Sequence, residues 1–539
     1  MHELKDLRPS SVTGISAHQL ARALDTTVHS GPAETLITGV TLDSTDVQPG
    51  DLFVAIPGFK RHGAEFAAKA IAAGAVAVVT DAAGISMLAG MEDIAMLRVS
   101  NPRVFAGLAA ALVYGNPGKS MRVVGITGTN GKTTTAHFVH HVLAALSGPT
   151  LLIGTVGVSL GEVHVSSART SLEAPVLHRV LAWALERGAQ NVVMEVSSHA
   201  LSLYRVAGLK FDVSAFLNLQ RDHLDFHKTM ESYFEAKASL FAADFSKRAV
   251  ICIDDGWGER LAQMVRIPTV TVATKSAADW QVVSHSLNQK DAGTDVTIRA
   301  GEADLRLHCP LPGMINVQNE LTALAVLVSL GFEASSVCEE LARTPGVPGR
   351  MEVVAERSSS TPLVIVDFAH TADAIKSACA ALDPVTPGSL WILFGATGER
   401  DRGKRPVMGA AALSSADYVV LTDDDIYGED PAQIRAEVAA GFAGVAGRAR
   451  SAWVSDDRKS AIHEAVLAAS PDDTVLIAGR GHETIQMVGE KAHVLDDRVE
   501  ARVAVSKRSV QNQLGEVGGE EKTACPKLRT ISKTWEDFQ

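Results

Sequence analysis

The stretch VVGITGTNGKTTTAHFVHHVL, residues 123–143, joins an apolar run to a glycine-rich loop and then to a pattern typical of a helix. Gly128 and Gly131 allow backbone N–H groups to turn inward, and Lys132 follows at once, so the loop is suited to bind phosphate. The usual phosphate-loop pattern has a glycine where this chain has Ile126. We therefore predict a variant loop that binds ATP or GTP; a plain strand-to-helix turn is the alternative.

The composition is that of a globular protein. A chain of 539 residues exceeds what one hydrophobic core usually holds, so several domains are expected. The formal net charge of −12 disfavours non-specific binding of nucleic acid, whose phosphates bind basic surfaces. The five cysteines form no C-x-x-C pair, which predicts reduced thiols. No apolar run approaches roughly 18 residues, so we expect a cytoplasmic protein without membrane insertion.

Two joints rich in proline and glycine, YGNPGKSM (114–121) and RTPGVPGRMEV (343–353), divide the chain into three regions. Apolar strand-like runs alternate with helical stretches in each region, which is typical of parallel α/β sheets. We therefore predict an α/β fold of three domains: an amino-terminal domain over 1–117, a central P-loop domain over 118–345 and a Rossmann-like domain over 346–506. Residues 507–539 lose the apolar rhythm and are predicted to be a disordered tail.

Acidic residues and histidines gather after two later strand-like runs. VVMEVSSHAL ends a buried strand at Glu195, and a carboxylate at the carboxyl end of a strand can hold Mg²⁺. The segment NLQRDHLDFHKT then carries four such residues close together: Asp222, His223, Asp225 and His227. A polar loop with chance histidines is the alternative. Zinc bound by His223 and His227 is also conceivable, although no cysteine or further histidine lies nearby at ligand spacing.

Six motifs follow one another along the chain: GTNGKTT, MEVSSH, NLQRDHLDFH, PGRMEVV, DFAHTADA and ERDRGKRPVMG. In order and spacing they resemble the motifs of the Mur ligases, over about residues 40–500. Within that family the chain is most similar to the ligases that add the third peptide residue to UDP-MurNAc-L-Ala-D-Glu, a precursor of peptidoglycan. The resemblance implies that ATP phosphorylates a substrate carboxylate and that the amine of an amino acid attacks the acyl phosphate, giving an amide, ADP and phosphate.

The same resemblance implies the catalytic and nucleotide-binding residues. Lys132, Lys237, His223 and His370 are expected to be catalytic. Lys237 would be an N6-carboxylysine, because a bare ammonium repels Mg²⁺ whereas a carbamate offers it oxygens; a surface lysine is the alternative. Two Mg²⁺ ions are expected, with ligands from Thr133, Glu195, His223 and the Lys237 carbamate. The expected ATP-binding residues are Thr127, Gly128, Thr129, Asn130, Gly131, Lys132, Thr133, Thr134, Asn316, Asn319, Arg350 and Asp367.

The amino-terminal region resembles the family's UDP-sugar-binding domain. TLDSTDVQPGDLFVAIPGFKRHG (41–63) is similar to the element that holds the uridine and the diphosphate. The sugar-peptide contacts carry over to ARTSLEAP and to the residues after Glu195. The residues expected to bind the UDP-sugar-peptide are Leu42, Ser44, Phe59, Lys60, Arg61, Thr170, Ser171, Ser197 and Arg205.

The amino-acid end departs from the pattern of family members that use meso-diaminopimelate. In those ligases an acidic strand end leads into Asp-Asn-Pro-Arg, whose arginine pairs with the distal carboxylate; in TDDDIYGEDP, Tyr427 takes the place of that arginine. Asp424 and Asp425 would instead attract an ammonium. We therefore expect L-lysine or L-ornithine, with meso-diaminopimelate as the alternative. The residues expected to bind the amino acid are Arg400, Asp424, Asp425, Tyr427, Gly481 and Glu483.

The partners implied are UDP-MurNAc-L-Ala-D-Glu, ATP with Mg²⁺, and a diamino acid, and we expect a monomer. Two other interpretations stay open. A folylpolyglutamate synthase or another Mur ligase would share the phosphate loop, but would not be expected to combine LDST…PGDLF with FGATGERDRGKRP. A regulatory ATP-binding protein without ligase chemistry would not be expected to retain all the residues of the expected reaction centre.

Overall fold

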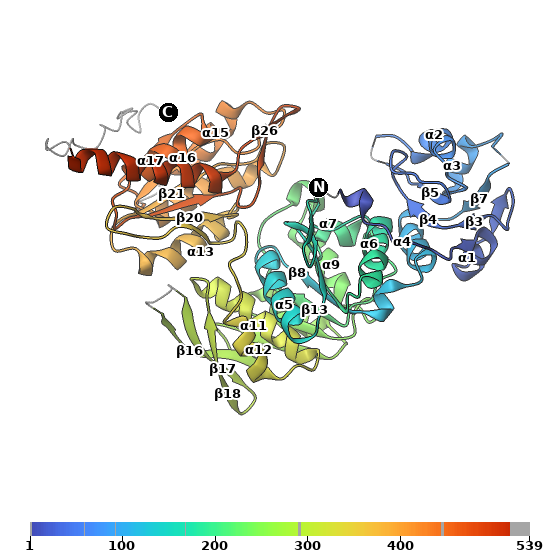
Figure 1. The fold of residues 1–539 in the computed structure, drawn as a ribbon, viewed down its shortest axis with the longest axis horizontal. Coiled ribbons are helices and arrows are strands. Elements are labelled where there is room, and N and C mark those ends of the chain that lie inside the picture. Colours follow the sequence, from blue (N-terminus) through green and yellow to red (C-terminus); the bar gives the residue numbers. More distant parts are fainter. Residues whose placement is uncertain are drawn as a thin grey trace.

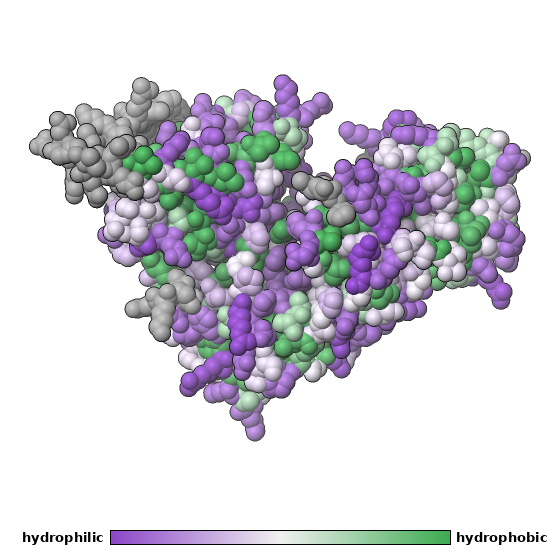
Figure 2. All heavy atoms as spheres, in the orientation of Figure 1, coloured by the Kyte–Doolittle hydropathy of each residue, from purple (hydrophilic) through white to green (hydrophobic). Residues whose placement is uncertain are grey.

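The structure, a computed structural model, describes residues 3–517 apart from residues 59, 92, 168, 289–292 and 444–446. Three α/β domains follow one another along the chain, each built on its own sheet (Figure 1). The central domain lies between the other two, and the carboxyl-terminal domain lies at the upper left. Figure 2 shows an open notch along the upper edge between the outer domains, with hydrophilic residues on both sides. The three-domain α/β fold predicted from the sequence is confirmed.

The amino-terminal sheet has the strand order β2-β7-β6-β5-β4, with β4 to β7 parallel and β2 antiparallel at the edge. The loops after β4 and β5 therefore leave the sheet at the same edge. Helix α4 packs against α6 of the central domain (Figure 1). The strands are β2 (Val28–Ser30), β4 (Gly39–Thr41), β5 (Asp51–Ala55), β6 (Ala77–Thr80) and β7 (Ala95–Arg98), and the helices are α1 (Ala17–Ala23), α2 (Ala67–Ala72), α3 (Ala82–Met87) and α4 (Pro102–Val113).

The central sheet places the phosphate loop in its middle, because β8 lies between β12 and β13 in a parallel block. The block is formed by β9 (Thr150–Gly154), β12 (Asn191–Glu195), β8 (Arg122–Thr127), β13 (Val213–Phe216), β14 (Ala249–Cys252) and β15 (Thr269–Ala273). Antiparallel strands extend it on both sides: β10 (Gly157–Leu160) and β11 (Val163–Val165), and β17 (Thr294–Ala300) and β18 (Ala303–Cys309) beyond β16 (Trp280–Leu287).

Two apolar layers bury this sheet, as strands that read as continuous apolar runs require. One layer packs α5 and α11 on one face, and the other packs α6 and α9 on the opposite face. The helices of the domain are α5 (Lys132–Leu146), α6 (Ala174–Glu186), α7 (Ser198–Ser202), α8 (Leu224–His227), α9 (Met230–Ala238), α10 (Gly256–Met264), α11 (Met314–Ser329) and α12 (Ala334–Leu341).

The carboxyl-terminal sheet has the order β19-β20-β24-β21-β22-β23, parallel except for β19. Its strands are β19 (Glu352–Ala355), β20 (Leu363–Asp367), β21 (Leu390–Phe394), β22 (Tyr418–Leu421), β23 (Ser451–Val454) and β24 (Thr474–Ala478), and a hairpin follows of β25 (Ile485–Val488) and β26 (Lys491–Val494). The helices are α13 (Ala372–Leu382), α14 (Arg405–Ser415), α15 (Pro431–Ala439), α16 (Arg458–Ala468) and α17 (Asp497–Val517).

The prediction of a disordered tail from residue 507 is wrong at its start, because α17 continues to Val517; residues 518–539 lie outside the described residues. We propose residues 117 and 345 as the domain boundaries. Within the described part of the chain, no helix combines the length and apolar character needed to cross a membrane. Four cysteines, at 252, 309, 338 and 379, have buried thiols.

Candidate active site

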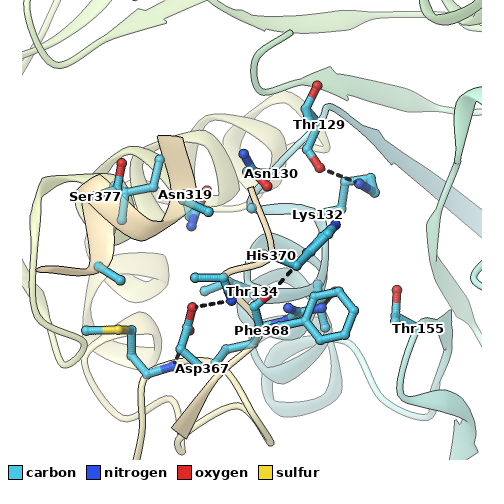
Figure 3. A pocket seen from close by; sticks show the side chains of 18 of the residues that line it. Thr129, Asn130, Lys132, Thr134, Thr155, Asn319, Asp367, Phe368, His370 and Ser377 are labelled. Atoms are coloured by element: carbon cyan, nitrogen blue, oxygen red, sulfur yellow. Dashed lines mark hydrogen bonds between the residues drawn. The ribbon is translucent and has the colours of Figure 1, made fainter. Parts of the chain in front are cut away.

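A cavity of about 290 Å³ lies between the central and carboxyl-terminal domains (Figure 3). The phosphate loop, the end of β12, the start of α11 and the loops around β20 line it. It brings together most of the residues predicted for the nucleotide and the metal. The predicted residues that line it are Thr129, Asn130, Gly131, Lys132, Thr133, Thr134, Thr170, Glu195, His223, Asn316, Asn319, Arg350, Asp367 and His370.

The phosphate loop follows directly from the sequence. Strand β8 is buried, and Thr127 at its end lies beneath the loop. Gly131 has φ +87°, and a Cβ there would lie 2.2 Å from Asn319 Oδ1, so only glycine fits between the loop and α11. The loop is closed by Asn130, whose N–H donates to Asn218 Oδ1 at 2.9 Å. Helix α5 begins at Lys132 and directs its amino end at the cavity, as a phosphate site requires.

Two lysines of the site share one backbone acceptor. Lys132 Nζ donates to Gly128 O at 3.0 Å, and Lys237 Nζ donates to the same oxygen at 2.8 Å. Burial lowers the pKa of both ammonium groups, and for Lys237 the charge of Lys132 adds to the effect. Lys237 is 1% exposed, so the alternative of a surface lysine is excluded. A neutral amine at Lys237 is the form that reacts with carbon dioxide.

The donors around Glu195 fit a hard cation. Thr133 Oγ1 lies 3.1 Å from Glu195 Oε2, and Thr155 donates to the same carboxylate through its N–H at 2.7 Å and its hydroxyl at 3.0 Å. Two oxygens so placed are at about the spacing of neighbouring ligands of octahedral Mg²⁺, whose bonds are about 2.1 Å. Thr133 and Glu195 would therefore hold Mg²⁺ beside the phosphate loop.

Asp222 joins the central domain to the carboxyl-terminal domain. It is buried, and its carboxylate lies 3.6 Å from His370 Nε2 and 3.7 Å from Lys404 Nζ, both from the third domain. Burial alone would raise the pKa of Asp222, but His370 and Lys404 outweigh it and hold the pKa well below its usual range. His223 follows in the left-handed conformation, φ +54°, and burial lowers its pKa to about 3. His223 is thus neutral, as a metal ligand requires.

The geometry does not support the zinc alternative. His227 Nε2 bonds to Ser198 Oγ at 2.9 Å, and its ring stacks on Tyr233. Among the described residues, the one group of three histidines, cysteines or acids close enough to hold a metal is Asp424, Asp425 and Glu483, in the other domain.

The third domain contributes Arg350 and the DFAH segment. Arg350 Nη2 donates to Thr133 Oγ1 at 3.0 Å, and its guanidinium lies over the ring of Phe368. Asp367 does not face the cavity as a free acid, because its oxygens accept the N–H groups of Met351 and Ala369 at 2.8 and 2.9 Å. It holds the loop that carries Arg350. His482 Nε2 lies 3.2 Å from the carbonyl of Thr155 and closes the domain contact.

Helix α13 lines the cavity with three alanines, Ala374, Ala378 and Ala381, and with the hydroxyl group of Ser377 (Figure 3). In the same cavity, Asn319 Oδ1 of α11 is buried without a partner in the described structure. Asn316 does not cap α11; its amide donates back to Pro312 O at 2.8 Å. Alanine side chains and an unsatisfied amide oxygen in one cavity suit a flat heterocycle that carries an amino group.

The residues predicted for the UDP-sugar-peptide lie in two groups. Leu42 and Ser44 follow β4, and Lys60 and Arg61 follow the neighbouring β5, so they share one sheet edge; Phe59 lies outside the described residues. Nearer the cavity, Ser171 Oγ lies 3.2 Å from Ser197 Oγ and donates to the carbonyl of Glu195 at 2.9 Å. The other members of this second group are Thr170, whose hydroxyl oxygen lies 3.2 Å from that of Thr155, and Arg205, which pairs with Glu173.

Buried charges fix the amino-terminal domain to the central domain. Arg179 of α6 is 2% exposed and donates to Asp46 Oδ2 at 2.9 Å, and Arg8 lies 3.2 Å from the other oxygen of Asp46. Arg179 also donates to the carbonyl of Leu4 at 3.2 Å. Asp46 belongs to the loop that carries Leu42 and Ser44, so this network sets where that loop lies.

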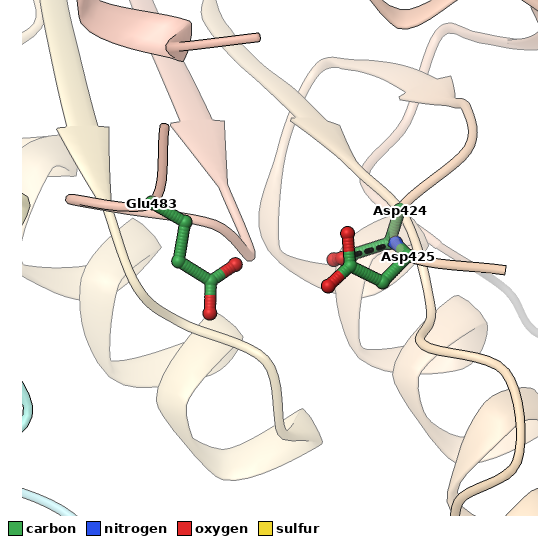
Figure 4. Close-up of side chains that lie close together, drawn as sticks. All are labelled: Asp424, Asp425 and Glu483. Carbon is green, nitrogen blue, oxygen red and sulfur yellow. Dashed lines mark hydrogen bonds between the residues drawn. The ribbon is translucent and has the colours of Figure 1, made fainter. Parts of the chain in front are cut away.

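The residues predicted for the amino acid lie at the carboxyl ends of β21, β22 and β24. Arg400 is exposed, with its guanidinium 5.6 Å from the centre of the Tyr427 ring. Gly481 has φ +54° and packs against Gly349. Asp425, which was expected to attract an ammonium, is paired within the protein: Arg480 Nη1 lies 2.7 Å from its Oδ1. Glu483 faces Asp424 and Asp425 (Figure 4), and burial together with Asp424 raises its pKa to about 8.

Several residues of the site were not predicted. Thr155 and Lys404 gave no local signal, because each acts across a sheet or a domain boundary. Arg480 stands in GRGHET, directly before Gly481, which the family motif did identify. The additional residues that shape the site are Thr155, Asn218, Gln220, Phe368, Ser377, Lys404, Arg480 and His482.

Comparisons with known proteins agree with this arrangement. Three family models match the chain: "Mur ligase family, catalytic domain" over 36–113, "Mur ligase middle domain" over 126–327, and "Mur ligase, glutamate ligase domain" over 349–481. The UDP-N-acetylmuramoyl-L-alanyl-D-glutamate–2,6-diaminopimelate ligase of Streptomyces coelicolor is 41% identical over 503 residues, covering 93% of this chain and 98% of the relative. The ligase of that name from Synechococcus elongatus is 41% identical over 481 residues, covering 88% and 94%.

A solved structure of a ligase with that name superposes with a TM-score of 0.64 at 30% identity, covering 92% of this chain and all of the other. The matches run through all three domains and include the phosphate loop, Glu195 and the third-domain loops that line the cavity. The chain therefore belongs to the Mur ligase family, as an ATP-dependent amide ligase.

Proposed function

We propose that the chain adds the third peptide residue, a diamino acid, to the D-glutamate of UDP-MurNAc-L-Ala-D-Glu. The observation that carries the proposal is the chain of contacts from Arg350 to Thr133 and from Thr133 to Glu195. It joins the phosphate loop, a cation site and the third domain within one cavity. Relatives named for this reaction at 41% identity support it.

In the proposed reaction, an oxygen of the substrate carboxylate attacks the γ-phosphorus of ATP, and ADP leaves. The amine of the incoming amino acid then attacks the carbonyl carbon of the acyl phosphate, and phosphate leaves as the amide forms. The carboxylate and the γ-phosphate are both anions, so their approach is opposed by repulsion. Lys132, at the amino end of α5, and Arg350 would offset that repulsion. Mg²⁺, when bound at Thr133 and Glu195, would withdraw charge from the phosphate oxygens.

We propose that Lys237 carries a carbamate in the active enzyme. Two ammonium groups that donate to one carbonyl oxygen repel each other, so the lysine of lower pKa tends to be neutral. Carbamylation replaces that repulsion with an attraction between the carbamate and Lys132. The carbamate would also supply oxygens for a second Mg²⁺, with His223 nearby; the contact of the Tyr233 ring with Lys237 would hold the side chain in place.

For the amino acid, we propose meso-diaminopimelate. The expectation of L-lysine rested on Tyr427 in place of an arginine and on the attraction of Asp424 and Asp425 for an ammonium, but Asp425 is paired with Arg480. Glu483, with a pKa of about 8, is mostly protonated at neutral pH. The attraction for a distal ammonium is therefore weaker than the sequence suggested, and the relatives' names favour the diaminopimelate alternative.

L-Lysine or L-ornithine is the second candidate, and one observation favours it. Tyr427 stands where the diaminopimelate pattern has an arginine, and Asp424 has no cation closer than 3.7 Å among the described side chains. The second candidate therefore differs from the first only in the third residue added.

The test is ATP turnover with purified protein, UDP-MurNAc-L-Ala-D-Glu, Mg²⁺ and each amino acid in turn. We expect ADP release with meso-diaminopimelate and a product whose mass equals the UDP-tripeptide. Faster turnover with L-lysine or L-ornithine would replace the first candidate by the second. ADP release that requires no amino acid, or no release with any of the three, would refute the proposed ligase reaction.

A further inference from the structure

The three carboxylates at the ends of β22 and β24 surround a buried arginine. Arg480 is 0% exposed. Its Nη1 lies 2.7 Å from Asp425 Oδ1, 3.7 Å from Asp424 Oδ1 and 4.0 Å from Glu483 Oε2. The guanidinium thus supplies the positive charge that this cluster needs, which is why the grouping in Figure 4 does not require a metal ion.

The pair of Arg480 and Asp425 joins two segments far apart in the chain. Asp425 Oδ1 also accepts the N–H of Met487 at 2.9 Å, and Arg480 Nη2 donates to Ile485 O at 2.5 Å. Backbone bonds continue the contact: Ile426 N donates to Met487 O at 3.0 Å, and Gly489 N to Tyr427 O at 2.7 Å. The turn over 424–428 is therefore held as an extra edge of the β25–β26 hairpin.

Tyr427 stands at the end of this turn in a costly conformation. Its φ is +48°, in the left-handed region, which costs a residue with a side chain about 1 kcal/mol or more. Its hydroxyl lies 3.5 Å from Asp425 Oδ2, and its ring lies beneath the guanidinium of Arg400. The contacts that keep Tyr427 in place thus lead back, through Asp425, to Arg480.

We propose that Arg480 is a positioning residue for the amino-acid end of the site: by pairing with Asp425 it fixes the turn that presents Tyr427, whose ring lies beneath Arg400, to the incoming amino acid. Arg480 is too deeply buried to touch the substrate itself. Asp425 is accordingly a part of the scaffold and not a ligand for the substrate's side chain. The inference rests on the proposed function, since it assumes that an amino acid binds beside Arg400.

The test is a cycle of three variants, Arg480→Gln, Asp425→Asn and the double variant, assayed for KM of the amino acid, KM of ATP and kcat. In Arg480→Gln the carboxylate of Asp425 is left buried and unpaired, so the turn shifts to solvate it. We expect KM for the amino acid to rise about tenfold or more, because small displacements of positioning groups have large effects. KM for ATP should stay within about twofold. The double variant should recover most of the loss, since a neutral amide at position 425 needs no cation.

Arg357→Gln is the matched control. Arg357 is a half-buried arginine of the same domain, and it donates to Asp473 O at 2.8 Å and to Thr474 Oγ1 at 2.9 Å, at the amino end of β24. The Arg357→Gln variant should have a lower unfolding temperature but an unchanged KM for the amino acid. If Arg480→Gln does not fold, Arg480→Lys gives the same comparison with a smaller rise in KM, because an ammonium keeps the pair with Asp425 but loses the bond to Ile485.

Three results overturn the inference: an equal rise in KM for ATP, a double variant no better than Arg480→Gln, or an equal effect of Arg357→Gln. If the wild type shows amino-acid-dependent turnover and the Arg480 variants keep its KM for the amino acid, this inference alone is overturned. A wild-type protein without amino-acid-dependent turnover overturns the proposed function and this inference with it.

Discussion

Glu320, in the middle of α11, gives the most direct test of the buried electrostatics. Its side chain is 0% exposed within the core layer that covers the phosphate-loop face of the central sheet, and neither carboxylate oxygen has a hydrogen-bonding nitrogen or oxygen partner in the described structure. Burial raises its pKa from 4.5 to about 8, although the thiol of Cys309 offsets part of the effect. Between pH 4.5 and about 8, Glu320 is therefore protonated in the folded protein but ionised in the unfolded chain.

The sign of the pH dependence follows from this difference. Below pH 4.5 both states hold the proton, so Glu320 makes no difference to the free energy of unfolding. As pH rises from 4.5 to about 8, the native state keeps a proton at increasing cost, and stability falls. At about 1.4 kcal/mol per pKa unit, the full shift corresponds to about 4–5 kcal/mol, most of it lost by pH 8.

Glu320→Gln removes the charge and keeps the shape. We expect the variant to match the wild type at pH 5 and to unfold at a higher urea concentration at pH 8.5, by about 2–4 kcal/mol after relaxation around the site. The assay is urea unfolding of the central domain followed by tryptophan fluorescence at both pH values. Glu339→Gln, an exposed glutamate of α12, is the control and should change neither curve. The reasoning would be refuted if the difference in unfolding free energy between Glu320→Gln and the wild type were the same at pH 5 and at pH 8.5.

Three further predictions concern the site. Lys237→Ala should reduce kcat by about 100-fold or more, and bicarbonate should raise the activity of the wild type but not of this variant; equal stimulation of both would contradict the carbamate. Gly131→Ala should abolish detectable ATP binding by calorimetry, because its Cβ would lie 2.2 Å from Asn319 Oδ1 and φ +87° disfavours a side chain; unchanged affinity would show that the loop adapts. Arg179→Met should raise KM for the UDP-substrate about tenfold while KM for ATP stays unchanged, since it leaves Asp46 without its buried partner; an equal change in both would point to general loosening.

The sequence allowed the fold class and the middle of the site to be predicted, because both depend on local signals. The phosphate loop, Glu195 at a strand end and the histidine-rich segment are contiguous motifs, and the structure brings residues of all three to one cavity. The pairing of Arg480 with Asp425 could not be predicted, since 55 residues separate them. The contact of Asp222 with Lys404 depends on how two domains meet, which no local pattern encodes.

Two structural elements were missed for a different reason. The antiparallel strands β16 to β18 are buried on one face at most, so their residues lack the continuous apolar runs that mark the parallel strands. Residues 507–517 do carry apolar residues at helical spacing, Val510, Leu514 and Val517, but the polar residues between them favour a tail, so the end of α17 could not be predicted with the rest of the helix.

The buried contact of Arg179 with Asp46 has a consequence for substrate length. It fixes the loop of Leu42 and Ser44 relative to α6, and the phosphate loop lies in the same central domain as α6. Under the proposed function, one end of the substrate is bound at the first loop and its reacting carboxylate must arrive at the second. The fixed distance between the two loops then selects the length of the substrate. A precursor one residue shorter would not reach the ATP, and one residue longer would place an amide where the carboxylate should be.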